Sequence, residues 1–365
     1  MPPNSALQSH LPALLASSTQ PDRLQTQFDA FCELVEREGV ASSDVLETIE
    51  ICKRSVEPEE LLHCVLNLAQ NAEGRSSLSV AGVLPVFVTL ASQGSYPARA
   101  LLRHPDDLIY LATNARHDLS WGVEAMVTIL LKDIEQSSEP GEPRKDVVAR
   151  ALRRFKRRES LRIYLREVEG LASVRQTTAE IADLAQACLE VAVVEGAADL
   201  GDASLANDFC VLGMGKLGGR ELNYSSDVDL IYICTDTVTD DATRRRQIDA
   251  LARWVTAALD AATADGYVFR VDLRLRPEGD LGPLVQPVSA MISYYLQWGR
   301  TWERSAMLKA RAVAGDPAIG AALTQALEPF LFRKYLDYAV IDDLRSMKQM
   351  VNDNAQLSAI VGLPE

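Results

Sequence analysis

Residues 211–230, with the sequence VLGMGKLGGRELNYSSDVDL, permit two different folds for this chain. Their first half follows the pattern G-x-G-x-x-G after an apolar run, which is the outline of a dinucleotide-binding loop. Their second half places Asp227 and Asp229 two residues apart at the start of another apolar run. Such an acid pair is typical of metal-dependent phosphoryl chemistry. The spacing between the glycines and the acids decides between the two folds.

That spacing excludes a dinucleotide-binding loop. Such a loop opens a helix that runs on to the next parallel strand, but Gly218 and Gly219 interrupt this helix, and Asp227 arrives before a full crossover fits. A Walker A loop also fails, because leucine follows Gly-Lys where Ser or Thr is required. What remains is a strand, a glycine-containing turn, a short helix and a strand that opens with D-x-D. This is the arrangement of a nucleotidyltransferase, in which backbone N–H groups and Lys216 face a phosphate.

The two acids predict a site for hard divalent cations. Alternation along a strand places Asp227 and Asp229 on the same face, where their charges repel unless a cation lies between them. Two cations held in this way can clamp a phosphate that is displaced in line. Because no histidine or cysteine stands near the pair to select a softer metal, Mg²⁺ is the expected ion, with Mn²⁺ possible.

A second segment, YVFRVDLRLRP at residues 267–277, alternates without a fault and predicts a half-buried strand over residues 267–275. One face carries charged side chains: Arg270, Asp272, Arg274 and Arg276. If this strand lies beside the D-x-D strand, Asp272 supplies a third carboxylate and the arginines can hold phosphate oxygens bidentately. The open alternative is a solvent-facing strand whose charges pair only with one another.

Composition excludes several classes of protein. The chain has 365 residues, enough for two or three domains, and its net charge of -14 argues against a general nucleic-acid binder. Its six cysteines and four histidines show no metal-ligand spacing, and the cysteines are expected to be buried thiols. No secretory leader or membrane-spanning apolar run is evident, so we expect a soluble, cytoplasmic protein without membrane partners.

The patterning along the chain predicts four regions. Residues 1–20 are expected to be a loose leader and residues 21–195 a helical domain. Residues 205–287 carry the nucleotidyltransferase core, and residues 288–365 are helical again. Between the first two domains, residues 195–207 have the composition of a flexible hinge. A long helix is expected over residues 244–264.

One helix, residues 152–166, is rich in arginine around an apolar stripe. Two interpretations remain open for it. The arginines form a solvated helix face, or they form a basic surface that faces phosphate or an acidic partner.

Three linked motifs resemble the glutamine synthetase adenylyltransferase family. They are GMGKLGGRELNYSSDVDLIYI, FRVDLRLRPEGDLGPLVQP and WERSAMLKARAVAGD, and two helical segments, residues 152–172 and 330–351, resemble the same family. These bacterial enzymes attach AMP to a glutamine synthetase tyrosine and remove it again, with two nucleotidyltransferase domains. The form of the first motif is similar to the adenylyl-removing copy. The tail from residue 352 departs from the family, so we expect a fragmentary N-terminal half.

The resemblance implies an α+β chain, mostly helical, with a small DNA polymerase β-like nucleotidyltransferase core built on a mixed sheet. It implies phosphorolysis of adenylyl-tyrosine on glutamine synthetase, giving ADP, with three aspartates as catalytic residues and ligands of two Mg²⁺ ions: Asp227, Asp229 and Asp272. The residues implied to bind nucleotide or phosphate are Gly213, Lys216, Gly218, Gly219, Ser225, Ser226, Arg270, Arg274 and Arg276. Phosphate, ADP or ATP, glutamine synthetase and a PII signal protein are the implied partners.

Two alternatives to this activity stay open. The same core can run forward as an ATP-dependent adenylyltransferase, or the chain can be a catalytically silent module that docks on glutamine synthetase or PII. Further residues match family positions without an implied role: Trp302, Glu303, Arg304, Lys309 and Arg311. Helix periodicity alone places Trp302 equally well in a core.

Overall fold

The computed structural model describes residues 7–114, 120–332, 345 and 349. The chain divides into two compact units, Met1–Ser120 with Arg157–Thr177, and Trp121–Lys156 with Thr178–Glu365. Two long helices, α11 (Arg144–Val168) and α12 (Val174–Asp199), each contribute residues to both units. The end of the segment 330–351 and the tail from residue 352, which carried predictions, lie almost entirely outside the described residues.

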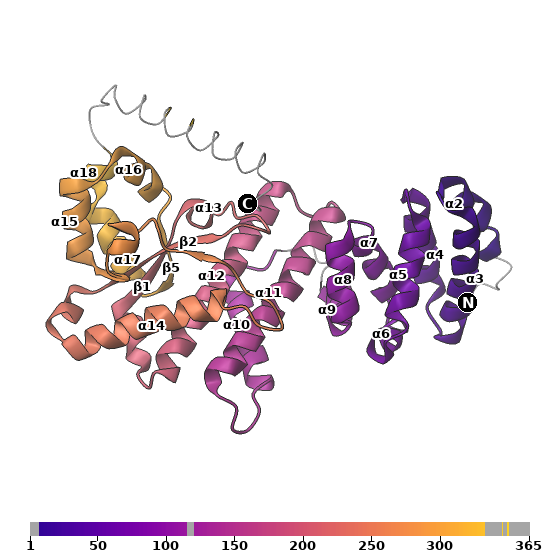
Figure 1. Cartoon of the computed structure of the whole chain (residues 1–365), viewed down its shortest axis with the longest axis horizontal. Helices are drawn as coiled ribbons and strands as arrows, with labels where there is room; N and C mark the ends of the chain where they lie inside the picture. The colour runs from indigo at the N-terminus through magenta and orange to yellow at the C-terminus, as the bar shows by residue number, and fades with distance from the viewer. Residues whose placement is uncertain (1–6, 115–119, 333–344, 346–348, 350–365) are drawn as a thin grey trace. The chain divides into compact units, whose positions relative to one another are not determined.

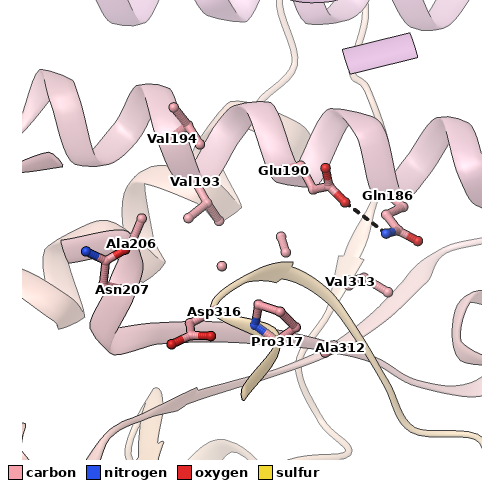
Figure 2. A pocket seen from close by; sticks show the side chains of 12 residues that line it. Gln186, Glu190, Val193, Val194, Ala206, Asn207, Ala312, Val313, Asp316 and Pro317 are labelled. Carbon is pink, nitrogen blue, oxygen red and sulfur yellow. Dashed lines mark hydrogen bonds between the residues drawn. The ribbon is translucent and has the colours of Figure 1, made fainter. Parts of the chain in front are cut away.

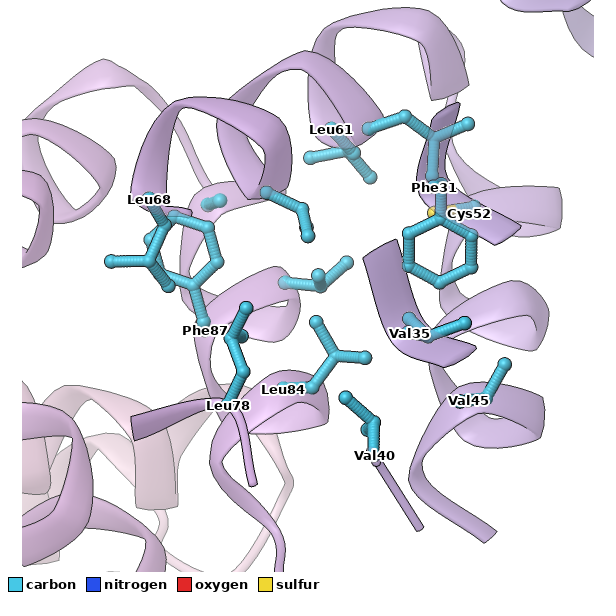
Figure 3. Close-up of a cluster of buried hydrophobic side chains, with 14 of the residues drawn as sticks. Phe31, Val35, Val40, Val45, Cys52, Leu61, Leu68, Leu78, Leu84 and Phe87 are labelled. Carbon is cyan, nitrogen blue, oxygen red and sulfur yellow. The ribbon is translucent and has the colours of Figure 1, made fainter. Parts of the chain in front are cut away.

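The first unit is helical. Its apolar side chains, including Phe31, Leu61 and Phe87, meet in one core (Figure 3). Helix α7 is apolar on every side and is buried accordingly, as expected for a helix at the centre of a bundle. The helices are α2 (Leu11–Ser17), α3 (Pro21–Arg37), α4 (Ser42–Arg54), α5 (Pro58–Leu68), α6 (Ala72–Ser77), α7 (Val83–Ala91), α8 (Ser95–Arg103) and α9 (Asp106–Asn114).

The expected loose leader is wrong from residue 7 onward. Leu7, Leu11 and Leu14 recur at helical spacing, and all three are buried in the core of this unit. Polar residues between these leucines give the segment the composition of a loop, although its apolar residues have a helical period. The leader therefore contributes apolar contacts to the helical unit.

Both interpretations of the arginine-rich helix are wrong for three of its arginines. Arg153, Arg162 and Arg166 in α11 are at most 2% exposed. Arg153 donates to the carbonyl oxygens of Gly266 (2.9 Å) and Ala258 (3.1 Å), and Arg162 Nε donates to the buried Glu159 carboxylate at 2.7 Å. All three guanidinium groups are buried, and those of Arg153 and Arg162 are hydrogen-bonded inside the protein, so they offer neither a solvated face nor a basic surface.

The second unit contains a five-stranded mixed sheet (Figure 1), which confirms the α+β class. The strand order is β3-β2-β1-β5, and β4 also pairs with β2. β1 is antiparallel to β2 and β5, whereas β2 is parallel to β3 and β4. The strands are β1 (Phe209–Gly213), β2 (Val228–Cys234), β3 (Val271–Asp272), β4 (Val285–Pro287) and β5 (Arg311–Gly315).

Helices cover both faces of this sheet. One face, which includes Leu212 and Ile231, packs in a single apolar cluster with the helices that follow β4. On the other face the Tyr232 hydroxyl is 2.9 Å from the Thr256 hydroxyl of α14. The helices of this unit are α10 (Val123–Gln136), α13 (Gly215–Gly218), α14 (Ala242–Asp260), α15 (Val288–Trp298), α16 (Thr301–Met307), α17 (Pro317–Ala326) and α18 (Glu328–Leu331), with 3₁₀ turns η1 (Ala203–Asp208), η2 (Asp236–Asp240) and η3 (Gly279–Leu281).

Two further expectations about this unit are wrong. Residues 195–207 are not a hinge, because α12 continues to Asp199 and η1 begins at Ala203; alanines favour the helix, and Glu195 is fixed by Arg144 at 2.7 Å. The region after residue 288 is not wholly helical either. It contributes the edge strand β5, whose five small or charged residues carry no clear period.

The expected strand over residues 267–275 is also wrong, since only Val271–Asp272 is a strand. Val268 and Phe269 are both buried, which breaks the alternation before the strand, and turns follow it. In the described part of the chain, no helix is both long and apolar enough to cross a bilayer.

Candidate functional site

The D-x-D acids and the third aspartate meet at neighbouring strand positions. β2 and β3 run parallel, and their register pairs Val228 with Val271 and Asp229 with Asp272. Paired residues of adjacent strands lie about 5 Å apart and present their side chains to the same face. The expected pairing of the two segments is therefore present, although β3 is much shorter than expected.

The three carboxylates differ in their surroundings. Burial, and then the neighbouring charges of Asp272 and Asp227, raise the pKa of Asp229. The pKa of Asp272 is lowered, first by its hydrogen bonds with the Arg274 side chain, one of which is 2.5 Å long. Asp227 accepts a 2.5 Å hydrogen bond from Arg270 Nε. Arginine thus pairs directly with Asp227 and Asp272, while the charges of Arg274 and Lys216 offset the repulsion at Asp229 only in part.

The donor chemistry of these acids suits a hard divalent cation. Asp229 has an excess of negative charge around it, and carboxylate oxygens are the ligands that Mg²⁺ and Mn²⁺ prefer. Among the described residues, no group of three or more His, Cys, Asp or Glu side chains has the arrangement needed to hold a metal ion. Asp227 and Asp272 form ion pairs with Arg270 and Arg274, respectively. Both arginines are exposed, with 46% of the Arg270 side chain and 76% of the Arg274 side chain accessible.

The glycine turn brings backbone against Asp229. β1 leads into the four-residue helix α13, and the N–H of Met214 donates to the Asp229 carbonyl at 2.9 Å. Gly215 has φ +50, and a Cβ added there would lie 2.7 Å from Asp229 Oδ2. Only glycine combines this left-handed conformation with such a close approach. The conformation of the turn is thus matched to the carboxylate beside it.

Lys216 and Ser226 lie together at the mouth of this turn. Lys216 Nζ donates to Ser226 Oγ at 3.4 Å, and Ser226 Oγ donates to Asn223 Oδ1 at 2.6 Å. The Ser225 carbonyl accepts a 3.3 Å hydrogen bond from Arg270 Nη2. The serine pair is therefore tied to the two cationic side chains that flank the acids.

Two glycines implied to bind phosphate are sites of close packing. A Cβ on Gly213, in the middle sheet strand β1, would lie 2.8 Å from Val313 and 2.9 Å from Leu217. A Cβ on Gly218 would lie 1.9 Å from the Lys309 carbonyl oxygen. Gly219 is exposed, and its N–H donates to the Gly215 carbonyl. Gly213 and Gly218 therefore need glycine for close packing whether or not a phosphate binds nearby.

Arg276 does not share the face of Asp272, contrary to the alternation. The chain turns after β3, the Arg276 side chain is only 10% exposed, and its guanidinium donates to the Leu273 carbonyl at 2.7 Å. It also lies 3.5 Å from Asp280. The structure therefore brings Arg270 and Arg274 to the carboxylates but not Arg276.

The motif over residues 302–316 contributes from several places. Trp302 is 38% exposed, so the core interpretation of this residue is wrong. Glu303 is buried and accepts hydrogen bonds from Tyr294 and from the Arg300 backbone, each at 2.8 Å. Lys309 forms an ion pair with Glu221, beside the glycine turn. The matched positions with contacts to that turn are thus at the end of the motif, where β5 begins.

Three anchoring residues, Arg220, Asp183 and Gln186, are not singled out by the sequence. Arg220 donates to Asp183 Oδ2 on α12 at 2.6 Å, and Arg311 donates to Gln186 Oε1 one turn further along the same helix. Asp183 and Gln186 stand three residues apart, which places them on one helix face. That spacing was the available signal, but it names no partner until the fold is known.

A cavity of about 560 Å³ lies beside these anchors, between α12 and the edge strand β5 (Figure 2). Gln186 and Glu190 line it and share a 2.8 Å hydrogen bond. Its other walls come from η1 and from residues 312–317. None of the residues predicted for nucleotide, phosphate or metal binding lines this cavity.

The strand, glycine turn, short helix and D-x-D strand, with a third acid on the adjacent parallel strand, form the arrangement that the sequence predicts for a nucleotidyltransferase core. Residues 86–326 match the family described as glutamate-ammonia ligase adenylyltransferase. This match covers more than half of the chain. The chain belongs to the glutamate-ammonia ligase adenylyltransferase family.

Similar curated proteins carry the name bifunctional glutamine synthetase adenylyltransferase/adenylyl-removing enzyme. The protein from Nitrosococcus oceani is 45% identical over 214 residues, which are 55% of this chain and 22% of that protein. The protein from Thioalkalivibrio sulfidiphilus is 36% identical over 318 residues, 82% of this chain and 32% of that protein. The one from Pseudomonas putida is 38% identical over 284 residues, 70% and 29% respectively. The chain spans about a fifth to a third of the length of these relatives.

Proposed function

We propose that this chain is a nucleotidyltransferase that regulates glutamine synthetase by removing AMP from its adenylylated tyrosine. The observation that carries the proposal is the register of Asp229 with Asp272 on adjacent parallel strands, with Arg270 and Arg274 on the flanking acids. The names of the relatives include both an attaching and a removing activity. The form of the glycine motif favours removal.

In the proposed reaction, an oxygen of inorganic phosphate attacks the adenylyl phosphorus. The new P–O bond makes ADP, while the bond from phosphorus to the tyrosine oxygen breaks and the phenolate takes up a proton. The exposed Arg270 and Arg274 guanidinium groups, together with Lys216, are suited to hold the phosphate oxygens in line with the leaving oxygen. Bound Mg²⁺ or Mn²⁺, held by Asp227, Asp229 and Asp272, would offset charge that accumulates on the phosphates.

The direction of the reaction is tested with two substrates. The chain is incubated with adenylylated glutamine synthetase, phosphate and Mg²⁺, and ADP is measured; in parallel it is incubated with unmodified glutamine synthetase and labelled ATP, and AMP incorporation is measured. We expect ADP release in the first reaction. Incorporation of AMP in the second without ADP release in the first would reverse the assignment.

Site variants separate catalysis from docking. Asp227→Asn should abolish ADP release, whereas the matched Asp240→Asn variant, which removes an acid of η2 outside the site, should leave it unchanged. Binding of glutamine synthetase and of a PII protein is measured for both variants by calorimetry. Retained binding of these partners by a wild-type chain that turns over neither substrate would favour a silent docking module.

A further inference from the structure

The short helix that carries Lys216 depends on tertiary contacts for its position. α13 has four residues, Gly215–Gly218, and a helix of one turn is unstable without tertiary contacts. Its N-terminal end lies against the Asp229 carboxylate through Gly215. Any displacement of α13 therefore changes where Lys216 and the first N–H groups of the turn lie relative to the acids.

Arg311 holds the other end of this helix. It is the first residue of β5 and is paired with Gly213 at the end of β1. Its Nε donates to the Gly218 carbonyl and its Nη2 to the Leu217 carbonyl, both at 3.3 Å. These carbonyls lie at the C-terminal end of α13, where a cation is favourable and where backbone acceptors lack helical partners.

The same guanidinium group joins α13 to α12. Arg311 Nη1 donates to Gln186 Oε1, and Gln186 Nε2 in turn donates to Glu190 Oε1 at 2.8 Å (Figure 2). Burial lowers the pKa of Arg311, since the group is removed from water on this side of the sheet. All three guanidinium nitrogens are therefore used, two on α13 and one on α12.

A second contact, through Arg220, also ties the glycine turn to α12. Arg220, just after α13, has φ +56, a left-handed conformation that is strained for any residue other than glycine. Its N–H donates to the Leu217 carbonyl at 3.2 Å, and its side chain donates to Asp183 on α12 at 2.6 Å. The Asp183 side chain is only 9% exposed, so this ion pair fixes the end of the glycine turn to a buried point.

We propose that Arg311 is a positioning residue, which fastens α13 to Gln186 of α12 so that Gly215 and Lys216 stay in place beside Asp229. The consequence for turnover rests on the proposed function, but the fastening of α13 does not. Arg311 touches no reacting atom in this arrangement. Its effect passes through the four residues of α13.

Hydrogen exchange tests the fastening directly. Arg311→Met and Gln186→Leu are compared with the control variant Arg245→Met. In the wild type, Arg245 of α14 donates to the Val285 carbonyl of β4, remote from the turn. We expect peptides over residues 215–221 to exchange at least about tenfold faster in the two test variants and unchanged in the control. Gln186→Leu keeps Arg311 on α13, so it remains informative if Arg311→Met fails to fold.

Kinetics provides a readout that general destabilisation would not move. With adenylylated glutamine synthetase as substrate, we expect Arg311→Met to have a kcat about 10- to 100-fold lower than the wild type, with little change in KM for the protein substrate. This is the scale of the loss expected from an ångström-level misplacement. Arg311→Lys, which restores one donor, should recover part of kcat. Unchanged exchange over residues 215–221 in both test variants would overturn the proposal. Faster exchange in the test variants, together with a wild-type chain that turns over neither substrate, would instead refute only the proposed function.

Discussion

Replacing Asp229 with asparagine should make the protein more stable while removing its activity. Asp229 lies near two other carboxylates, and burial together with their charges raises its pKa. The ionised form is therefore disfavoured in the folded state relative to the unfolded chain. Asparagine keeps the shape of the side chain and removes the charge, so the folded state gains stability at neutral pH.

The magnitude follows from the strand register. Asp229 and Asp272 are paired residues on adjacent strands, about 5 Å apart, and two unit charges at that separation repel by about 3 kcal/mol at an effective dielectric constant of about 20. The Arg274 charge on Asp272, and the water around the half-buried Asp229, reduce the net gain to about 1 kcal/mol. This corresponds to a rise of about 2–4 °C in the unfolding midpoint.

The pH dependence provides the sharper test. Because the folded-state pKa of Asp229 is raised, the wild type regains stability as pH falls through that pKa, and the advantage of the variant should shrink from pH 7 towards pH 4. Thermal unfolding is measured across this range in metal-free buffer with chelator. Asp227→Asn is the contrast, since it loses the ion pair with Arg270 and should gain nothing. A lower midpoint for Asp229→Asn at pH 7, or an advantage that does not change with pH, would refute the reasoning.

Three further predictions concern the turn, the helical unit and the charges of the site. Gly215→Ala should lose activity and about 1–3 kcal/mol of stability, because its Cβ would meet Asp229 and its backbone is left-handed. Gly201→Ala, with φ +83 and open space around it, is the control for backbone strain alone. Both variants are compared with the wild type by denaturant unfolding and ADP release. Arg162→Met should lower the free energy of unfolding by about 3–5 kcal/mol, since it leaves the buried Glu159 charge without this partner, and Arg162→Met with Glu159→Gln should recover part of the loss. Mg²⁺ and inorganic phosphate should each raise the affinity for the other several-fold, by the same factor, in calorimetric titrations; equal affinities with and without the second ligand would count against shared use of Arg270 and Arg274.

The parts of the site that are local in sequence could be predicted. The glycine turn, the short helix and the D-x-D strand span residues 211–230, and their spacing alone excludes the dinucleotide fold. The adjacent acid could also be found, because Asp272 stands in a short segment with a charged face. What alternation could not show is where the strand ends. The turn after Asp272 sends Arg276 to Leu273 and Asp280 instead of to the carboxylates.

The parts that depend on contacts distant in sequence could not be predicted. Arg153 of α11 satisfies backbone carbonyls of Ala258 in α14 and of Gly266 beyond it, more than a hundred residues away, so a pattern that counts arginine as polar surface fails. β5 has no period of its own, and it is a strand because it pairs with β1. Asp183 and Gln186 likewise gain their meaning only from Arg220 and Arg311.

The net charge of -14 bears on how the proposed site would bind phosphate. The cationic groups nearest the acids are already engaged: Arg270 with Asp227, Arg274 with Asp272, and Lys216 with Ser226. Phosphate can take these cations only if the aspartates receive other positive charge, and a divalent cation can take the aspartates only if the arginines find other negative charge. The divalent cation thus neutralises the aspartates that lose their arginines to phosphate, and phosphate neutralises the arginines that lose their aspartates to the cation. Under the proposed function, such a site would discriminate against either ion alone, which suits a reaction that uses metal and phosphate together.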